Sequence, residues 1–238
     1  APNVCTPPSG TNNTQFGTKK LLDGSAWKTV LVSGLGGGGQ GVFALDVTNP
    51  SAFTADNVLW EFSDRDDVQM GNVIGRPQVL KFRTSAPGAT SPTYKHFAVV
   101  ASGVNNYALD GRASGTNRPV LFLLDLSKAP SASWALGTNY WKIELTSADG
   151  AAINGLVGFS ATAGTADSVQ AIYAGDLQGQ VWKLDFASQG QSNWTLNKLS
   201  AVKNGSGTAL PLFQARDNAN RRQPITMEPT VAFGPNQG

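Results

Sequence analysis

The sequence predicts an all-β fold, a β-propeller with four antiparallel strands per blade and a ring that is incomplete in this chain. Three observations lead to this fold class. A four-part pattern of short strands recurs, each occurrence includes a strand that closes on Leu-Asp, and the composition suits many strands and turns. Because 14% of residues are charged, 40% are hydrophobic, and glycine (27) and proline (13) are frequent, long helices are not expected.

The first two parts of the pattern are a leading strand and an apolar strand that ends on small residues and glycine. The predicted leading strands are GNVIGRPQVLKF (71–82), NGLVGFSATAG (154–164) and QPITMEPTVAFG (223–234). The glycine-ended strands are KTVLVSG (28–34), FAVVASG (97–103) and QAIYAGD (170–176). A turn after a buried strand favours positive φ, so we predict this conformation at Gly34, Gly103 and Gly175.

The third part is a strand that ends on Leu-Asp, and the fourth is a strand that contains tryptophan. Leu-Asp closes GVFALDV (41–47), RPVLFLLDL (118–126) and QVWKLDF (180–186). The tryptophan strands are VLWEF (58–62), NYWKIEL (139–145) and NWTLNKL (193–199). Both faces of a blade pack on its neighbours, so polarity returns where a strand leaves the sheet. We expect Asp46, Asp125 and Asp185 to accept backbone N–H groups of the following turns and to have structural roles.

These repeats divide the chain into residues 1–26, an N-terminal segment without a clear assignment, and residues 27–238, the propeller portion. The propeller portion holds about three blades and the start of a fourth, and a ring needs at least four. The terminal blades are therefore expected to expose apolar faces, including parts of 30–32 and 225–233, and the chain alone is expected to self-associate.

Charge and residue counts exclude several function classes. The net charge is +2 and no run of Lys or Arg exceeds a pair, so no nucleic-acid partner is predicted. Apolar runs are strand-sized, far below the roughly 20 residues of a membrane helix, and no transmembrane segment is expected. The chain has one cysteine, Cys5, whose pairing the sequence leaves open, and one histidine, His96. We therefore predict no catalytic residue and no enzyme activity.

A glycine-rich tract, GLGGGGQG (34–41), matches the spacing of a dinucleotide-binding loop. That loop requires a helix after the glycines, whereas the strand-like VFALDV follows here. We interpret the tract as a hairpin between two strands, and no cofactor-binding residue is predicted.

The acidic segment SDRDD contains the candidate metal ligands Asp64, Asp66 and Asp67. One interpretation is a cation site made by the three carboxylates. The other, which we favour, is a solvated loop in which Arg65 reduces the repulsion between like charges.

Several stretches together resemble one known family. They are WKTVLVSGLGGGGQGVFALDVTNP (27–50), VLWEFSDRDD (58–67), MGNVIGRPQV (70–79), the SGVNN turn (102–106) and, most specifically, YAGDLQGQVWKLDF (173–186). In this order they resemble the C-terminal domain of the PilY/PilC family of type IV pilus tip-associated adhesins. The resemblance runs from about residue 27 to the C-terminus, and residues 1–26 show no counterpart.

The resemblance implies a modified β-propeller behind an adhesive N-terminal region, exported to the pilus tip or outer surface of a Gram-negative bacterium. Members of the family support pilus biogenesis, oppose retraction, and promote attachment and twitching motility. The implied partners are pilins or minor pilins, the rest of the protein's own chain, and a host or abiotic surface.

Calcium is a point of departure from the family. Many members bind this ion in an Asp-rich loop just before the segment that matches YAGD. The corresponding stretch here is SATAGTADSVQ (160–170), whose single acid is Asp167. Calcium takes six to eight oxygen ligands, usually with several carboxylates, so we do not carry the calcium site over and predict no cofactor.

Two alternative functions remain open at this point. Quinone-dependent dehydrogenases are propellers with quinoprotein-like blades, and ALDVTNP…VLW (44–60) partly matches their Ala-x-Asp-x-x-x-Gly…Trp pattern. Their site also needs calcium, a general base and a stacking Trp, and no such set is identifiable here. The other alternative is an outer-membrane scaffold propeller, which residues upstream of this chain would distinguish from a pilus protein.

Overall fold

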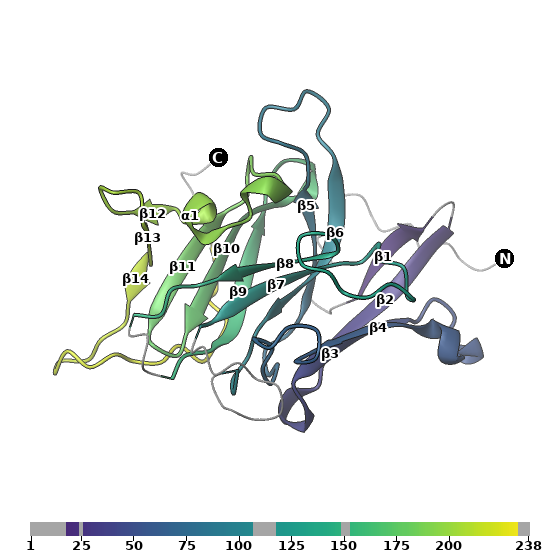
Figure 1. The fold of residues 1–238 in the computed structure, drawn as a ribbon, viewed down its shortest axis with the longest axis horizontal. Coiled ribbons are helices and arrows are strands. Elements are labelled where there is room, and N and C mark those ends of the chain that lie inside the picture. Colours follow the sequence, from purple (N-terminus) through teal and green to yellow (C-terminus); the bar gives the residue numbers. More distant parts are fainter. Residues whose placement is uncertain (1–17, 24–25, 107–117, 149–152, 233–238) are drawn as a thin grey trace.

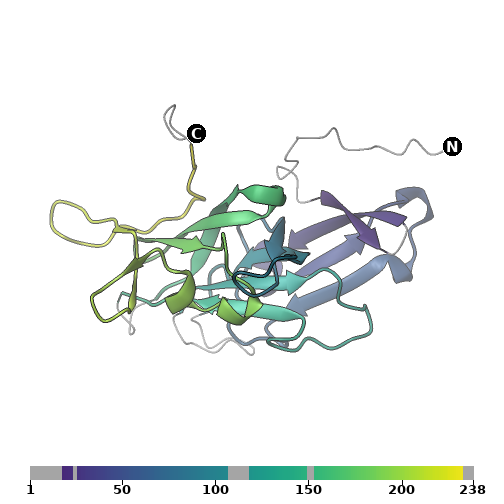
Figure 2. The same cartoon turned by 90° about the horizontal axis from the view of Figure 1, so that it is seen from above.

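The structure is a computed structural model that describes residues 18–23, 26–106, 118–148 and 153–232. Three four-stranded antiparallel sheets lie side by side, in chain order from right to left in Figure 1, and Figure 2 shows the same row from above. In the described part of the chain, the α-helical content is one four-residue helix, α1 (Leu196–Leu199). The predicted all-β class is confirmed.

The first sheet follows chain order: β1 (Thr18–Asp23), β2 (Ala26–Gly34), β3 (Gly41–Asp46) and β4 (Val58–Ser63). β1 pairs antiparallel with β2, so part of the N-terminal segment 1–26 contributes a strand to this sheet. The glycine-rich tract forms the β2–β3 hairpin, as predicted, with Gly34 opposite Val42. The Asn72 side-chain amide holds this hairpin, since it donates to the carbonyl oxygens of Gly36 (3.0 Å) and Gly39 (3.1 Å).

The second sheet repeats this order with β5 (Gln78–Arg83), β6 (Tyr94–Ala101), β7 (Val120–Asp125) and β8 (Tyr140–Glu144). The third contains β9 (Leu156–Ala163), β10 (Val169–Asp176), β11 (Gln180–Asp185) and the two-residue β14 (Phe213–Gln214). β12 (Val202–Lys203) and β13 (Ala209–Leu210) form a separate hairpin. Short 3-10 turns cover Gly36–Gly38, Pro50–Ala52, Ala55–Asn57, Thr165–Asp167 and Gln191–Asn193.

The Leu-Asp strands end as the sequence predicts. β3, β7 and β11 have Asp46, Asp125 and Asp185 as their last residues. The Oδ1 atom of each carboxylate accepts the backbone N–H two residues further on, from Thr48 (3.0 Å), Ser127 (2.8 Å) and Ala187 (2.9 Å). Each Asp therefore closes the turn by which the chain leaves its sheet.

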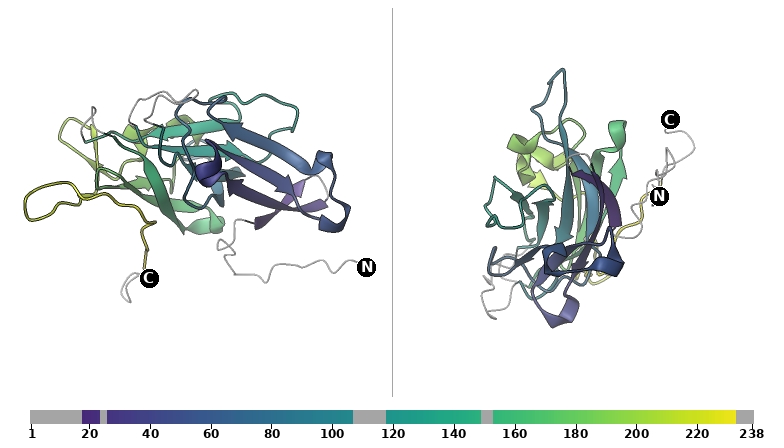
Figure 3. Two further views of the ribbon diagram at one scale, coloured as in Figure 1. Left: turned by 90° about the horizontal axis from the view of Figure 1, so that it is seen from below. Right: turned by 90° about the vertical axis from the view of Figure 1, so that its right-hand side faces the viewer.

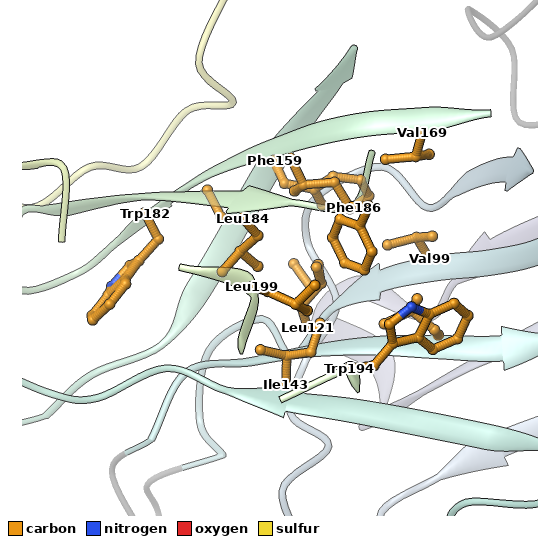
Figure 4. Packing of buried hydrophobic residues seen from close by; sticks show 14 of the residues in the cluster. Val99, Leu121, Ile143, Phe159, Val169, Trp182, Leu184, Phe186, Trp194 and Leu199 are labelled. Carbon is orange, nitrogen blue, oxygen red and sulfur yellow. The ribbon is translucent and has the colours of Figure 1, made fainter. Parts of the chain in front are cut away.

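Two hydrophobic cores join the three sheets. Between the first and second sheets, the Phe62 ring meets Phe122, Trp134 and Tyr140 edge to face at 5.1–5.3 Å, and Trp134 Nε1 donates to the Glu61 carbonyl (2.7 Å). Figure 4 shows the core between the second and third sheets, where the residues labelled from β6, β7 and β8 meet those from β9, β10 and β11. Aromatic pairs of this kind add about 0.5–1.5 kcal/mol each beyond area burial.

Three sequence predictions are corrected by this packing. Val30 and Val32 were expected on an exposed terminal face, but they are 2% and 7% exposed because they face the second sheet. Within 223–232 no strand forms, and Phe233 and Gly234 lie outside the described residues. NWTLNKL is not a strand either.

Trp194 explains the third correction. NWTLNKL forms the end of a 3-10 turn followed by α1, and the fourth strand of the third sheet is β14. Trp194 is 3% exposed, with its ring 5.2 Å from Phe97 and 5.5 Å from Trp141. Leu196 and Leu199 pack on the same core, and their spacing of three residues fits a helical turn better than strand alternation.

Candidate functional site

The SDRDD segment forms a tight turn directly after β4. The carbonyl of Ser63 accepts the N–H groups of Asp66 (3.0 Å) and Asp67 (3.1 Å), and Asp66 Oδ2 accepts the Ser63 N–H in return (2.9 Å). The Asp64 N–H donates to the Gln40 carbonyl (3.1 Å), which ties the turn to the β2–β3 hairpin. Asp66 therefore closes the turn as a backbone acceptor.

Asp67 points the other way, toward the second sheet. Its side chain is 4% exposed, and Oδ2 lies 2.8 Å from Lys142 Nζ and 3.1 Å from the Tyr140 hydroxyl, which donates to it. The Gln69 backbone N–H donates to Oδ1 (3.0 Å), and the Gln69 side-chain oxygen accepts from Lys142 (2.6 Å). Burial raises the pKa of Tyr140 well above its usual range, and the Asp67 charge raises it further, so the phenol keeps its proton and donates.

The three candidate metal ligands are thus close in sequence, but their side chains do not share one set of partners. Asp67 neutralises Lys142 at the junction of two sheets, while Asp66 binds backbone. Across residues 18–23, 26–106, 118–148 and 153–232, no group of three or more His, Cys, Asp and Glu side chains is placed to hold a metal ion. In this structure the segment links the first and second sheets through the ion pair between Asp67 and Lys142, which we call the latch.

The stretch 160–170 forms the β9–β10 hairpin. Its turn places Ala166 (φ 61°) and Asp167 (φ 53°) in the left-handed region, and the Gly164 N–H donates to the Ser168 carbonyl (2.8 Å). Lys81 Nζ donates to the Ala166 carbonyl (2.9 Å). This hydrogen bond links β5 of the second sheet to the β9–β10 turn of the third sheet.

Asp176, from the YAGDLQG motif, is the centre of a buried polar cluster in the third sheet. Its Oδ1 accepts the backbone N–H groups of Gln178 (3.0 Å) and Gln180 (2.9 Å), and Oδ2 accepts the side-chain amides of Gln180 (2.8 Å) and Asn154 (3.3 Å). Burial raises the pKa of Asp176, and these hydrogen bonds offset part of that effect. The backbone carbonyl of Asp176 accepts the Ile225 N–H (3.0 Å), so the cluster also anchors the segment that leaves the third sheet.

Glycines allow the chain to cross closely from one sheet to the next. Gly103 has φ 75°, as predicted, but Gly34 and Gly175 do not have positive φ, so that prediction is wrong for these two. Glycine is required at these two positions because another segment of the chain approaches closely. A Cβ on Gly34 would lie 2.8 Å from the Val73 carbonyl oxygen, and one on Gly175 would collide with the Ile225 side chain. The side chains of the crossing segments thus dock where a glycine leaves room.

Further contacts join crossing segments to one another and to the sheets. Arg76 reaches Glu228 with an N–O separation of 3.2 Å, and Ser160 Oγ donates to the Pro229 carbonyl. Glu228 also lies against Gly158, whose Cβ would be 3.2 Å from it. Residues 223–232 are thereby fixed on the third sheet without forming a strand.

Sequence reasoning did not identify Lys142, Asn154 or Gln180 as junction residues. Lys142 lies in β8 between the half-buried Trp141 and the buried Ile143, and only the fold brings Asp67 to it. The Asp-x-x-Gly spacing of Asp176 and Gly179 did carry a local turn signal. Within the described residues, no helix is long and apolar enough to cross a membrane.

Comparison with known proteins gives a consistent result. Residues 16–237 match the family described as the PilY1 beta-propeller domain, so the match begins within the segment 1–26, for which the sequence had indicated no counterpart. The type IV pilus biogenesis factor PilY1 homolog of Xylella fastidiosa is 34% identical over 226 residues, which cover 91% of this chain and 13% of that protein. The type IV pilus biogenesis factor PilY1 of a Pseudomonas aeruginosa strain is 32% identical over 229 residues, covering 91% of this chain and 17% of that protein.

A solved structure agrees with the sequence matches. The crystal structure of the Pseudomonas aeruginosa PilY1 C-terminal domain superposes with a TM-score of 0.69 and 25% sequence identity, covering 92% of this chain and 41% of that one. The chain spans less than a fifth of the length of the two curated relatives described above.

Proposed function

The chain belongs to the PilY1 β-propeller family, and from this membership we propose that it is a non-catalytic section of a type IV pilus biogenesis factor. The observation that carries the proposal is the match over residues 16–237, together with identities of 34% and 32% to proteins named for that role. Three blades would serve the full-length protein as a rigid platform, since buried cores and polar latches join them.

The non-catalytic part of the proposal is supported by what the buried acids do. Asp67 binds Lys142 across a sheet junction, Asp125 closes a turn, and Asp176 accepts four hydrogen bonds from Gln178, Gln180 and Asn154. A general base or nucleophile must be able to contact a substrate, whereas these carboxylates already bind groups of the protein itself.

We extend the proposal to location and partners. In this proposal the full-length protein lies at the pilus tip or outer surface of a Gram-negative bacterium, contacts pilins or minor pilins, and promotes attachment to a host or abiotic surface. It supports pilus assembly and opposes retraction, so its loss reduces the number of surface pili.

Deleting the gene in the bacterium that encodes it tests the proposal. Pilin sheared from the cell surface, twitching motility and attachment should all decrease, and the full-length gene should restore them. In a strain whose retraction is disabled, surface pilin should return without the gene if the protein opposes retraction. Unchanged surface pilin in the deletion strain contradicts the pilus role, and quinone-dependent dehydrogenase activity of the purified protein contradicts the non-catalytic role.

A further inference from the structure

The connection between β5 and β6, residues 84–93, differs from the other described connections in composition and position. Its sequence, TSAPGATSPT, has no charged residue, two prolines and five hydroxyl side chains in ten positions. It projects beyond the sheets as the loop at the top of Figure 1 and of the right-hand view in Figure 3. The β10–β11 turn, by contrast, needs only residues 177–179.

The base of this hairpin is fixed by its own hydrogen bonds. The Thr84 and Thr93 hydroxyls bond to each other (2.9 Å), and Ser85 Oγ accepts the Thr93 N–H (3.3 Å). The Arg83 guanidinium donates to the Ala86 carbonyl (2.9 Å). Outside the hairpin, the Gln191 N–H donates to the Thr84 carbonyl (3.3 Å). Three of the five hydroxyl side chains therefore hold the loop in shape.

The other two hydroxyls, on Thr90 and Ser91, follow the turn in which the Ala89 N–H donates to the Ala86 carbonyl (3.3 Å). Both residues are exposed, and within the described part of the chain neither hydroxyl has a hydrogen-bond partner. Pro92 disfavours helical backbone at Ser91, which lies in a bend of the chain. Beyond its hydrogen-bonded base, the loop thus has two adjacent hydroxyls that are exposed and without a hydrogen-bond partner in the described structure.

From this arrangement we infer that Thr90 and Ser91 are acceptors of an O-linked glycan. Segments rich in Ser, Thr and Pro are the compositional mark of O-glycosylation. A hydroxyl oxygen would attack the anomeric carbon of a sugar carried as a diphosphate ester. The glycosidic bond forms, the bond from that carbon to the donor phosphate breaks with its electron pair on the phosphate, and the hydroxyl proton passes to a base of the transferase.

A sugar fits this loop better than a phosphate. A phosphoryl group is stabilised by nearby Arg or Lys, and residues 84–93 contain neither. The basic side chains that flank the loop in sequence are already engaged: Arg83 donates to the Ala86 carbonyl (2.9 Å) and Lys95 to Asp125 Oδ2 (2.7 Å). The inference depends on the envelope location given under Proposed function, because the acceptor must meet the transferase there.

The experiment is peptide mapping of the full-length protein purified from the envelope of the cells that naturally produce it. Trypsin cleaves after Arg83 and Lys95, so residues 84–95 form one peptide. We expect this peptide to carry the mass of one or more sugar residues, with fragmentation placing them on Thr90 or Ser91. The envelope fraction is quantified separately: absence from the envelope overturns both proposals, whereas an unmodified peptide from envelope protein overturns only the glycan.

Two matched variants sharpen the test. The T90A/S91A variant should lose the added mass, and the T84V/T93V variant, which removes only hydroxyls at the base, should keep it. Retention of sugar in T90A/S91A, sugar located on Thr84, Ser85 or Thr93, or phosphate in place of sugar would each overturn the inference.

Discussion

Replacing Gly34 by alanine tests how the second sheet docks on the first. The added Cβ would lie 2.8 Å from both the carbonyl oxygen and Cγ1 of Val73, and 2.9 Å from its Cβ, where ordinary contacts are 3.4–4 Å. Val73 is 3% exposed, and its chain is fixed because Asn72 exchanges backbone hydrogen bonds with Val104 (2.7 and 3.1 Å). The clash therefore involves backbone and a buried side chain, and neither moves freely.

Gly37 is the matched control in the same hairpin. It has no positive φ, and a Cβ there meets nothing within 4 Å. Both substitutions restrict the unfolded chain equally, which stabilises by about 0.4–1 kcal/mol. Overpacking costs about 1–3 kcal/mol, and only Gly34→Ala incurs it. The difference between the two variants is thus about 1–3 kcal/mol, free of the unfolded-state contribution.

Thermal unfolding followed by circular dichroism measures this difference. For a chain of this size each kcal/mol shifts the melting temperature by roughly 2–4 °C, so Gly34→Ala should melt roughly 2–12 °C below Gly37→Ala. Indistinguishable melting temperatures would refute the argument that the crossing segment requires glycine at position 34.

Three further predictions concern charge. Lys142→Met should destabilise the fold by about 3–5 kcal/mol in urea unfolding, because Asp67 would stay buried without a cation; a loss below about 1 kcal/mol would contradict the latch. Because burial raises the pKa of Asp176, the folded state binds the proton of this carboxyl group more tightly than the unfolded state does. The free energy of unfolding should therefore rise as the pH falls from the raised pKa of the folded state to the ordinary value of 3.8, and level off below it. The melting temperature of wild type relative to Asp176→Asn should therefore increase on acidification, and a constant difference would argue against this. Millimolar calcium should leave the melting temperature unchanged, since a cation that binds the native state must stabilise it; an increase reversed by chelator would show a site that we did not assign.

The elements that the sequence predicted correctly depend on local chemistry. β10 and β11 pair antiparallel with Ala171 opposite Asp185 and Gly175 opposite Val181, as expected for two apolar strands around a Leu-Gln-Gly turn. The closing role of the Leu-Asp carboxylates was predictable for the same reason, since the acceptor and donor are two residues apart.

The features that sequence reasoning missed depend on distant parts of the chain. Trp194 was assigned to a strand because two earlier units end in a Trp strand, but its ring fills a space set by Phe97 and Trp141 of another sheet. Likewise, nothing near Asp67 in sequence indicates Lys142, which is 75 residues away. Gly34 was correctly singled out, but for a turn, and its close approach to Val73 appears only once the sheets are packed.

The central claim, that this chain is part of a pilus-associated protein, is tested most directly by locating the full-length protein. An epitope inserted at Gly205, in the β12–β13 turn where a Cβ meets nothing within 4 Å, leaves the sheets intact. The tagged protein should appear in the pilus fraction sheared from cells and leave that fraction when the major pilin gene is deleted. Retention with the cell pellet, with or without pilin, would contradict the claim.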